Sequence, residues 1–329
     1  MRPKVFIDGH AGTTGLRIHE WLSDRDDLEL HTLPDDVRKN IEARRKQMLS
    51  VDVAVLCLPD DEAKTVARWV DHSSIRVIDA STAHRVAEGW VYGLPELGQA
   101  QRDAIRGARY VSNPGCYASA FVLLVRPLID KKILTTDAPI IVHALSGYSG
   151  GGHSLIERWE QSNAGLMSLT YEAPYAYDRL HKHIPEMMKF SCLQREPQFI
   201  PAVGPFRCGM RVQIPLHSAL LTSEANADTV WNALQEQYRN EPFVDLHPLI
   251  DEIAVDERTF DPQACNGTNC IQVRVLPHPS GHMTLMAILD NLGKGACGTA
   301  IQSLNIMLGF PQDTGLPMRT TGSSPISLM

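Results

Sequence analysis

Short apolar runs alternate with amphipathic stretches through the first 112 residues. Residues 4–8, 28–33, 53–58 and 75–79 are predicted to be strands, and 53–58 is fully apolar, as in a strand buried in a parallel sheet. Between them, residues 16–22 and 59–70 have the spacing of helices. This order predicts an α/β fold, in which a Rossmann-type doubly wound parallel sheet occupies residues 1–115.

The pattern changes after a long helix that is expected from Cys116 through the apolar run 118–129. Strands are predicted at 139–145, 211–216 and 271–276, with a capped helix at 223–238. Strands separated by such long excursions favour a mixed or antiparallel sheet, and so an α+β substrate domain over residues 116–290. Residues 290–309 are helix-rich, and the polar tail 317–329 is expected to be loosely held.

Composition and charge exclude several classes of protein. The 329 residues are 43% hydrophobic and 21% charged, as in an ordinary globular protein, and the net charge of −7 does not support nucleic-acid binding. No apolar run reaches eighteen residues, so no membrane span is expected. The first residues enter a strand without a signal-peptide pattern, which favours the cytoplasm.

The seven cysteines are scattered and odd in number, which favours reduced thiols over disulfides. Cys265 and Cys270, with His278 and His282 downstream, are the one arrangement that resembles a zinc site. The four residues between the two cysteines have the character of a turn instead, and no metal is expected.

A glycine-rich turn follows the first strand with the spacing G-x-x-G-x-x-G, at Gly9, Gly12 and Gly15. Glycines in this position let the backbone approach a pyrophosphate at a helix N-terminus, and the hydroxyls of Thr13 and Thr14 are further phosphate donors. The turn therefore predicts a dinucleotide site. The carboxyl ends of parallel strands bring further residues to the same edge: Leu58, Pro59, Ser81 and Asn113.

The segment after the second strand leaves the choice of dinucleotide open. Asp35 and Asp36 would hold the ribose hydroxyls of NAD, whereas Arg38 and Lys39 would accept the 2′-phosphate of NADP.

Asn113-Pro114-Gly115-Cys116 places a cysteine on the first turn of a helix, next to this edge. The positive end of the helix dipole favours the thiolate, although a cysteine that merely packs in the core is the alternative. A thiolate beside a nicotinamide indicates covalent acyl chemistry, in which the sulfur accepts an acyl group and hydride reduces the thioester.

Such chemistry also needs an acid/base, an oxyanion hole and an anion clamp. One of the two histidines His181 and His183 is the candidate acid/base, since the pKa of an imidazole lies near neutrality. The backbone N–H of Cys116 and the side-chain amide of Asn113 are candidate oxyanion donors. Candidates for the anion clamp are the basic residues Arg85, Arg158, Lys182, Arg207 and Arg211.

Eight blocks in order resemble one known family. They are Phe6-Ile7-Asp8-Gly9 with Ala11-Gly12-Thr13-Thr14-Gly15; Leu56-Cys57-Leu58-Pro59-Asp60-Asp61; Val77-Ile78-Asp79-Ala80-Ser81-Thr82-Ala83-His84-Arg85; Tyr92-Gly93-Leu94-Pro95-Glu96; Asn113-Pro114-Gly115-Cys116-Tyr117; Ser146-Gly147-Tyr148-Ser149-Gly150-Gly151-Gly152; His181-Lys182-His183-Ile184-Pro185-Glu186; and Asp290-Asn291-Leu292-Gly293-Lys294-Gly295-Ala296. Over nearly its whole length the chain resembles the N-acetyl-gamma-glutamyl-phosphate reductases of arginine biosynthesis, in particular their short second type.

The resemblance implies a semialdehyde-dehydrogenase-like fold and the NADPH-dependent reduction of N-acetyl-L-glutamyl 5-phosphate to N-acetyl-L-glutamate 5-semialdehyde plus phosphate. It implies Cys116 as nucleophile and a histidine of the pair as acid/base, of which His181 is favoured. It also implies further site residues: Ser149, Gly150 and Asn291 at the cofactor, and Asn113, Arg85, His183 and Arg207 at the substrate. The family's Arg-Gly is interrupted here, as Arg207-Cys208-Gly209, which leaves the role of Arg207 open.

The same resemblance implies that residues 291–315 form a last helix that returns to the dinucleotide-binding domain, and that the protein is a cytoplasmic homo-oligomer, a dimer or tetramer. Three alternatives remain open. The closest is aspartate-semialdehyde dehydrogenase or another acyl-phosphate reductase of the same fold. The others are a cysteine hydrolase, for which the glycine-rich turn would have no purpose, and a dinucleotide sensor without a reactive thiol.

Overall fold

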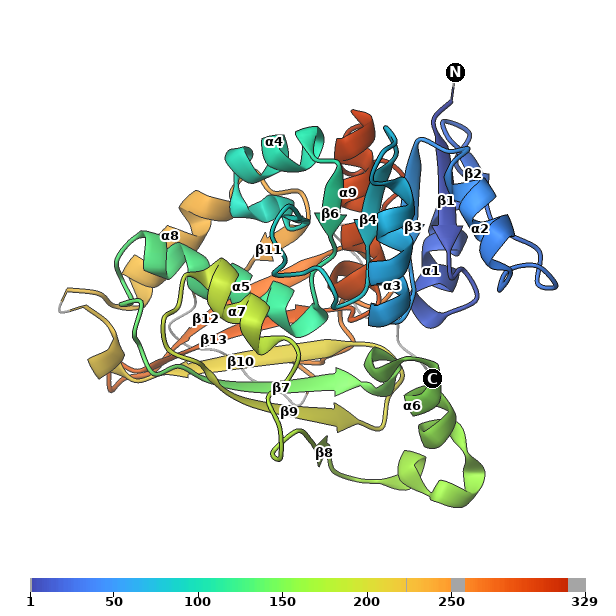
Figure 1. Ribbon diagram of the computed structural model, residues 1–329. Coiled ribbons are helices and arrows are strands. Elements are labelled where there is room, and N and C mark those ends of the chain that lie inside the picture. Colours follow the sequence, from blue (N-terminus) through green and yellow to red (C-terminus); the bar gives the residue numbers. More distant parts are fainter. Residues whose placement is uncertain (1, 223, 250–257, 319–329) are drawn as a thin grey trace.

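Two sheets with separate cores make up the molecule, for which the computed structural model describes residues 2–222, 224–249 and 258–318. The first sheet is entirely parallel, with strand order β2-β1-β3-β4-β6-β5, and helices pack on both of its faces (Figure 1). Its strands are β1 (Lys4–Asp8), β2 (Glu29–His31), β3 (Val53–Leu56), β4 (Arg76–Asp79), β5 (Val91–Tyr92) and β6 (Tyr110–Ser112). The predicted doubly wound sheet is confirmed.

The helices of this part follow the strands in alternation. They are α1 (Thr13–Leu22), α2 (Ile41–Met48), α3 (Asp60–Ala67) and α4 (Gln99–Gly107). The last helix of the described chain, α9 (Gly298–Leu308), contacts α4, α1 and β4, so the chain returns to the first sheet after completing the second.

The second sheet is mixed, with strand order β11-β12-β13-β10-β7-β9-β8. The pairs β7–β9 and β11–β12 are parallel, and the other neighbours are antiparallel. Its strands are β7 (Ile141–Gly147), β8 (Ala173–Pro174), β9 (Gln198–Gly204), β10 (Met210–Leu216), β11 (Val244–Leu246), β12 (Ile271–Pro277) and β13 (Met283–Leu289). The mixed sheet expected from the sequence is therefore present.

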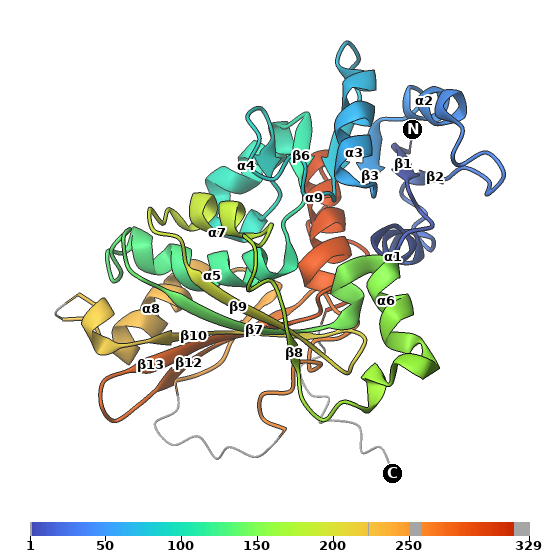
Figure 2. The same ribbon diagram turned by 60° about the horizontal axis from the view of Figure 1, so that its bottom comes forward.

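Three helices cover one face of this sheet: α5 (Cys116–Asp130), α7 (Ile184–Ser191) and α8 (Ala227–Tyr238). Helix α6 (Gly152–Glu160) lies beyond one end of the strands, and within the described part of the chain the opposite face carries no helix (Figure 2). Short 3₁₀ turns lie at Arg68–Val70, Pro95–Leu97, Tyr148–Gly151, Ser162–Ala164, Leu166–Ser168 and Ser218–Leu220, and one π-helical turn lies at Gly293–Cys297.

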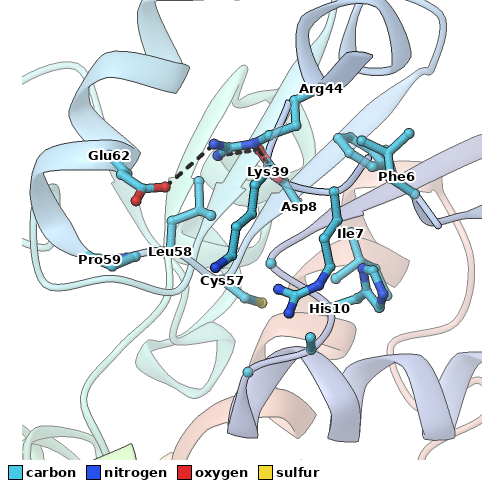
Figure 3. Close-up of a pocket in the computed structure, with 15 residues that line it drawn as sticks. Phe6, Ile7, Asp8, His10, Lys39, Arg44, Cys57, Leu58, Pro59 and Glu62 are labelled. Carbon is cyan, nitrogen blue, oxygen red and sulfur yellow. Dashed lines mark hydrogen bonds and ion pairs between the residues drawn. The ribbon is translucent and has the colours of Figure 1, made fainter. Parts of the chain in front are cut away.

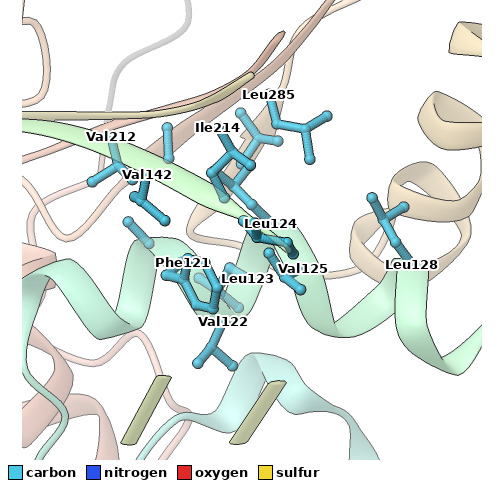
Figure 4. Packing of buried hydrophobic residues seen from close by; sticks show 14 of the residues in the cluster. Phe121, Val122, Leu123, Leu124, Val125, Leu128, Val142, Val212, Ile214 and Leu285 are labelled. Atoms are coloured by element: carbon cyan, nitrogen blue, oxygen red, sulfur yellow. The ribbon is translucent and has the colours of Figure 1, made fainter. Parts of the chain in front are cut away.

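Helix α5 is the centre of the larger core. Its residues 117–125 are all buried, as expected for a helix that is apolar on every side. Phe121 and Leu124 pack toward Val142 of β7 and Ile214 of β10 (Figure 4). This packing fixes the axis of α5, and therefore the position of Cys116 at its first residue.

The predicted boundaries differ from the observed ones where local hydrogen bonds decide them. Helix α1 begins at Thr13 rather than residue 16, because the Leu16 N–H already donates to the Gly12 carbonyl oxygen at 2.8 Å. Helix α8 begins at Ala227 because the side chain of Asn226 accepts from the Thr229 N–H in a capping box. Position 223, where that helix was predicted to start, lies outside the described residues. Residues 319–329, which make up most of the predicted tail, also lie outside them.

Candidate active site

A pocket of about 420 Å³ opens at the carboxyl ends of β1 and β3 (Figure 3). The β1–α1 turn forms one wall, where Gly9 has a φ of +89° and a Cβ there would lie 2.3 Å from the Cys57 carbonyl oxygen. A Cβ at Gly15 would lie 2.4 Å from the carbonyl oxygen of Gly9. Both positions therefore require glycine, as in a turn that lets a phosphate approach backbone N–H groups.

The other predicted cofactor residues are divided between this pocket and its surroundings. Gly12, Leu58 and Pro59 line it, while Thr13 and Thr14 form the first turn of α1. Because that turn leaves N–H groups without intrahelical partners, it offers donors to a pyrophosphate.

The charged residues around the pocket are of two kinds: an arginine that is paired with carboxylates, and two further basic residues. Asp8 and Arg44 form a buried ion pair, with Arg44 Nε 2.9 Å from Asp8 Oδ1, and Arg44 Nη1 lies 3.4 Å from Glu62. The side chains of Arg38 and Lys39 also line the pocket, whereas Asp35 and Asp36 do not; Lys39 extends into it (Figure 3). The residues present therefore fit a ligand with an additional phosphate on the ribose.

Cys116 is the first residue of α5 and follows Gly115, the N-cap. The backbone N–H groups of the first helical turn have no partner within the helix and face outward from it. The Asn113 amide donates to the carbonyl oxygen of Ala296 at 2.9 Å, and its Oδ1 has no hydrogen-bond partner. This bond uses one of the two N–H donors of the amide that was predicted as an oxyanion donor, whereas the N–H groups of the helix start have no partner within the helix and are the better candidates.

The predicted ionisation of the thiol needs correction. Burial raises the pKa of Cys116 to about 11, and the opposing effects of the Arg85 guanidinium, the Tyr117 N–H and Lys182 do not compensate for it. The dipole of the helix N-terminus is smaller than this desolvation effect. Cys116 is therefore a thiol at neutral pH, and a base must remove its proton when it attacks.

Glu186, which the sequence did not single out, fixes the backbone next to Cys116. One carboxylate oxygen accepts from the Gly115 N–H at 3.0 Å and from the Tyr92 hydroxyl at 2.9 Å, and the other accepts from Arg85 Nη1 at 2.9 Å. Arg85 Nε also donates to the Asn113 carbonyl oxygen at 3.0 Å. In the sequence this residue has the pattern of an ordinary acid in the first turn of a helix, so its buried contacts gave no distinguishing signal.

The two histidines next to Glu186 have different surroundings. His181 is half-buried; its Nδ1 accepts from the His183 N–H at 3.2 Å, and its Nε2 lies 3.3 Å from the Tyr175 hydroxyl. His183 is buried, and its Nδ1 has no hydrogen-bond partner. Burial and the nearby cations lower the pKa of His181 to about 4 and hold that of His183 well below its usual value. Both rings are therefore neutral at pH 7.

Tyr175 links His181 to the start of α5. Its hydroxyl donates to that of Tyr117 at 3.4 Å, and Tyr117 in turn donates to the Ala202 carbonyl oxygen at 3.4 Å. With the His183 N–H directed at Nδ1, the proton of the neutral His181 ring belongs on Nε2. His181 thus donates at Nε2 in this tautomer, and it accepts a proton at Nε2 in the tautomer that carries its proton on Nδ1.

Residues predicted at the nicotinamide end form a second cluster. The Asn291 amide donates to Ser149 Oγ at 2.9 Å, and its carbonyl oxygen accepts from the Gly209 N–H at 2.8 Å. A Cβ on Gly150 would lie 3.5 Å from the Asn291 amide nitrogen. Ser81 is buried beside β4, where its hydroxyl donates to Asp79 at 2.7 Å. The structure therefore brings Ser149, Gly150 and Asn291 together and holds Ser81 in place.

The candidate anion-binding residues are not all at the site. The Arg207 side chain is mostly exposed and pairs with Glu160 of α6 at 3.5 Å, and Arg211 donates to the Phe260 carbonyl oxygen. Arg85 is held beside the Cys116 loop by Glu186, as described above. Lys182 carries one of the charges that lower the pKa of Cys116, so it lies near the thiol.

The cysteines and histidines considered for zinc do not form a cluster. Cys265 packs against Met286 and Ile288, whereas His278 and His282 lie in the turn between β12 and β13. Across residues 2–222, 224–249 and 258–318, no group of three or more His, Cys, Asp or Glu side chains is placed to hold a metal ion. In the same ranges no helix has the length and apolar character needed to cross a membrane.

Two family models match the chain in consecutive segments. Residues 4–107 match "Semialdehyde dehydrogenase, NAD binding domain", and residues 116–291 match "Semialdehyde dehydrogenase, dimerisation domain".

Curated relatives cover nearly the whole chain. N-acetyl-gamma-glutamyl-phosphate reductase 2 of Nostoc sp. is 47% identical over 320 residues, which is 96% of this chain and 99% of the relative. The protein of the same name from Pseudomonas putida is 42% identical over 318 residues, 95% of this chain and 99% of the relative.

Solved structures of aspartate semialdehyde dehydrogenases share the fold at low sequence identity. Aspartate semialdehyde dehydrogenase II of Vibrio cholerae, complexed with ASA, superimposes with a TM-score of 0.72 at 17% identity, covering 94% of this chain and 99% of that chain. The enzyme of Candida albicans with NADP gives a TM-score of 0.62 at 15% identity, again covering 94% and 99%. At these identities the likeness establishes the architecture alone.

Proposed function

The chain belongs to the semialdehyde dehydrogenase family and, within it, to the N-acetyl-gamma-glutamyl-phosphate reductases, and we propose that it reduces N-acetyl-L-glutamyl 5-phosphate through a thioester on Cys116. It is an NADP-dependent oxidoreductase of arginine biosynthesis. The observation that carries the assignment of Cys116 is its position on the first turn of α5, with Gly115 held by Glu186.

In the first half of the reaction the Cys116 sulfur attacks the acyl carbon of the acyl phosphate. A carbon–sulfur bond forms, the bond from carbon to the phosphate oxygen breaks, and phosphate leaves with its bonding electrons. The thiol proton passes to a neutral imidazole of the histidine pair. The unpaired N–H groups at the start of α5 stabilise the negative charge that develops on the carbonyl oxygen.

The turn after β1, together with Arg38 and Lys39, would hold NADPH, which would supply the hydride for reduction of the thioester carbon. The carbon–sulfur bond then breaks to give the aldehyde, and the Cys116 sulfur regains its proton from the imidazolium. We assign the exchange of protons with substrate to His181, because its half-buried ring is accessible and carries its proton on Nε2. His183 is a second candidate for the base, favoured by its unpartnered Nδ1.

Arg85 is the proposed ligand of the substrate phosphate. Glu186 and the Asn113 carbonyl oxygen engage its Nη1 and Nε, which leaves Nη2 without a hydrogen bond in the described chain. Lys182 adds a second positive charge near the thiol. Asn113 and His183 stay proposed substrate contacts. Arg207 is a weaker one, since its guanidinium pairs with Glu160.

The proposed domains are residues 1–115 for the cofactor, 116–290 for catalysis and assembly, and 291–315 as the returning helix. The protein is a homo-oligomer, proposed to be a dimer or tetramer, and the helix-free face of the second sheet is the surface proposed for the contact. On that face Ile141, His143 and Pro215 are exposed.

The proposed compartment is the cytoplasm. Five cysteines present as thiols support it: Cys57, Cys116, Cys192, Cys208 and Cys297.

The substrate assignment predicts a preference that a competition assay measures. With NADPH held constant, kcat/KM for N-acetylglutamyl phosphate should exceed that for aspartyl phosphate by at least about 10³-fold, because the acetamido group and the longer chain have to be accommodated. Consumption of NADPH gives the rate. Faster turnover of aspartyl phosphate would instead identify an aspartate-semialdehyde dehydrogenase, and hydrolysis without NADPH binding would identify a hydrolase.

The basic rim of the cofactor pocket predicts a specific loss of NADPH affinity. Lys39→Glu should raise the Kd for NADPH by about 10–100-fold, the size of one charge-assisted bond to phosphate, and change that for NADH by less than about threefold. Calorimetry with 2′,5′-ADP and AMP separates the phosphate from the rest of the cofactor. Lys46→Glu is the matched control, since Lys46 is exposed on α2 and does not line the pocket. Equal losses for both nucleotides would contradict the assignment.

A further inference from the structure

Glu96 and Lys294 form an ion pair that is completely shielded from solvent. Both side chains have 0% exposure, and Lys294 Nζ lies 2.5 Å from Glu96 Oε1. Gln302 of α9 completes the group, because its carbonyl oxygen accepts from Lys294 at 2.7 Å and its amide donates to Glu96 at 2.8 Å. The second carboxylate oxygen of Glu96 has no hydrogen-bond partner. The mechanism proposed above uses neither charge.

Lys294 belongs to the π-helical turn Gly293–Cys297, which lies against the nucleophile. A Cβ on Gly295 would be 2.7 Å from the Cβ of Cys116, so the two backbones approach closely. The next residue, Ala296, accepts the hydrogen bond from the Asn113 amide. The turn therefore touches the site both at Cys116 and at the loop before it. Single π-helical turns of this kind occur frequently at functional sites.

The pair joins segments that are far apart in the sequence. Glu96 lies in the 3₁₀ turn Pro95–Leu97, within the segment that matches the NAD-binding model, and Lys294 lies just beyond the segment that matches the dimerisation model. Burial raises the pKa of Glu96, but the Lys294 ammonium and the hydrogen bonds to the carboxylate outweigh it and lower that pKa. The Glu96 carboxyl is therefore ionised at neutral pH.

Stability alone does not account for such a pair. Removing two charges from water costs free energy that their attraction often fails to recover, so apolar replacements of buried ion pairs are frequently as stable or more stable. A charged pair does, however, specify one arrangement of the two segments, since a shifted turn would leave either charge unpaired in the interior.

We propose that Glu96 and Lys294 are positioning residues that fix the Gly293–Cys297 turn against Cys116 and thereby set the location and solvation of the nucleophilic sulfur. The proposal rests on Cys116 as the nucleophile. A displacement of about 1 Å at a reacting centre is enough to lower turnover about 10²-fold.

Four variants test this role: Glu96→Gln, Lys294→Met, the double variant that combines them, and Glu241→Gln as a matched control. Glu241 pairs with Arg102 at 2.5 Å, which joins the NAD-binding segment to the dimerisation segment. In the described residues Glu241 makes no hydrogen bond or ion pair with the π-helical turn, although its carboxyl lies within electrostatic range of Lys294. The double variant leaves no unpaired charge and should therefore fold even where a single variant does not.

Two measurements are made on each folded variant. The first is kcat and KM with acyl phosphate and NADPH. The second is the rate at which iodoacetamide alkylates Cys116, determined by peptide mapping without substrate or cofactor. Cys192, which is exposed, and Cys57, whose thiol pKa is raised by burial, serve as internal references for the whole fold.

The double variant should keep the thermal midpoint of wild type and lose about 10²-fold in kcat, with the KM for NADPH within about twofold. Alkylation of Cys116 should become about tenfold faster, because a loosened turn admits water and lowers the pKa of the thiol. The reference cysteines should react as in wild type.

Two results would overturn the proposal: unchanged kcat and unchanged Cys116 alkylation in the double variant, or equal effects in Glu241→Gln. Failure of the function itself is recognised separately. In that case wild type would not reduce the acyl phosphate, while the alkylation data would still report on the position of the thiol.

Discussion

Replacing Cys116 with alanine is expected to lower the turnover of N-acetylglutamyl phosphate by at least about 10⁴-fold, because the variant has no group that can form the thioester. Affinity for NADPH should stay within about twofold of wild type, since the dinucleotide pocket is lined by β1 and the turn after it, by residues after β2 and by residues just after β3. The loss therefore falls on kcat. Stopped-flow reduction under single-turnover conditions measures it directly.

The same prediction has a chemical counterpart in wild type. Alkylation of Cys116 should abolish activity, and substrate should slow the reaction. Its rate should rise with pH well beyond neutrality, because burial holds the thiol pKa near 11. Cys192→Ser is the control, as Cys192 lies in the exposed turn that ends α7. If Cys116→Ala kept a tenth of wild-type turnover, a thioester at this residue would be excluded.

His181→Ala is expected to lower kcat by about 10²–10⁴-fold, the usual effect of removing a positioned acid/base. The sign of its pH dependence follows from the depressed pKa. The ring stays neutral down to about pH 4, so it can accept a proton across the neutral range and loses this capacity only as the pH approaches 4. A profile of kcat/KM against pH should therefore have its acidic limb near that value in wild type.

His183→Ala is the informative comparison. His183 is buried against Gly115, where a Cβ on that glycine would lie 2.5 Å from His183 Nε2. If its removal costs more turnover than that of His181, and the acidic limb persists in His181→Ala, the base is His183. The comparison of kcat and of the pH profile is made on variants of equal thermal stability. It then shows which of the two histidines is the base.

Much of this site was predictable because it follows from local sequence patterns. The β1 strand, the glycine turn and the helix at Cys116 depend on short apolar runs and on residues with special backbone freedom, which a sequence displays directly. The pairing of Glu186 with Gly115, and of Glu96 with Lys294, joins residues 71 and 198 positions apart. No local pattern distinguishes these acids from ordinary surface charges.

The ionisation state of the Cys116 thiol was the other property that was predicted wrongly from the sequence. A cysteine at a helix start suggests a thiolate, but the desolvation of Cys116 depends on what α5, α7 and the π-helical turn bury around it. The residues after β2 likewise left the choice between NAD and NADP open, and only the family resemblance implied NADP; in the structure Arg38 and Lys39 line the pocket, whereas Asp35 and Asp36 do not. Both outcomes depend on distant segments.

The π-helical turn has a consequence for biosynthesis of the chain. Since Gly295 abuts Cys116, the segment that packs against this residue is absent until residues 293–297 have been synthesised. A prematurely terminated product that ends before residue 290 would contain Cys116 and the glycine-rich turn, but it would lack the π-helical turn that packs against Cys116.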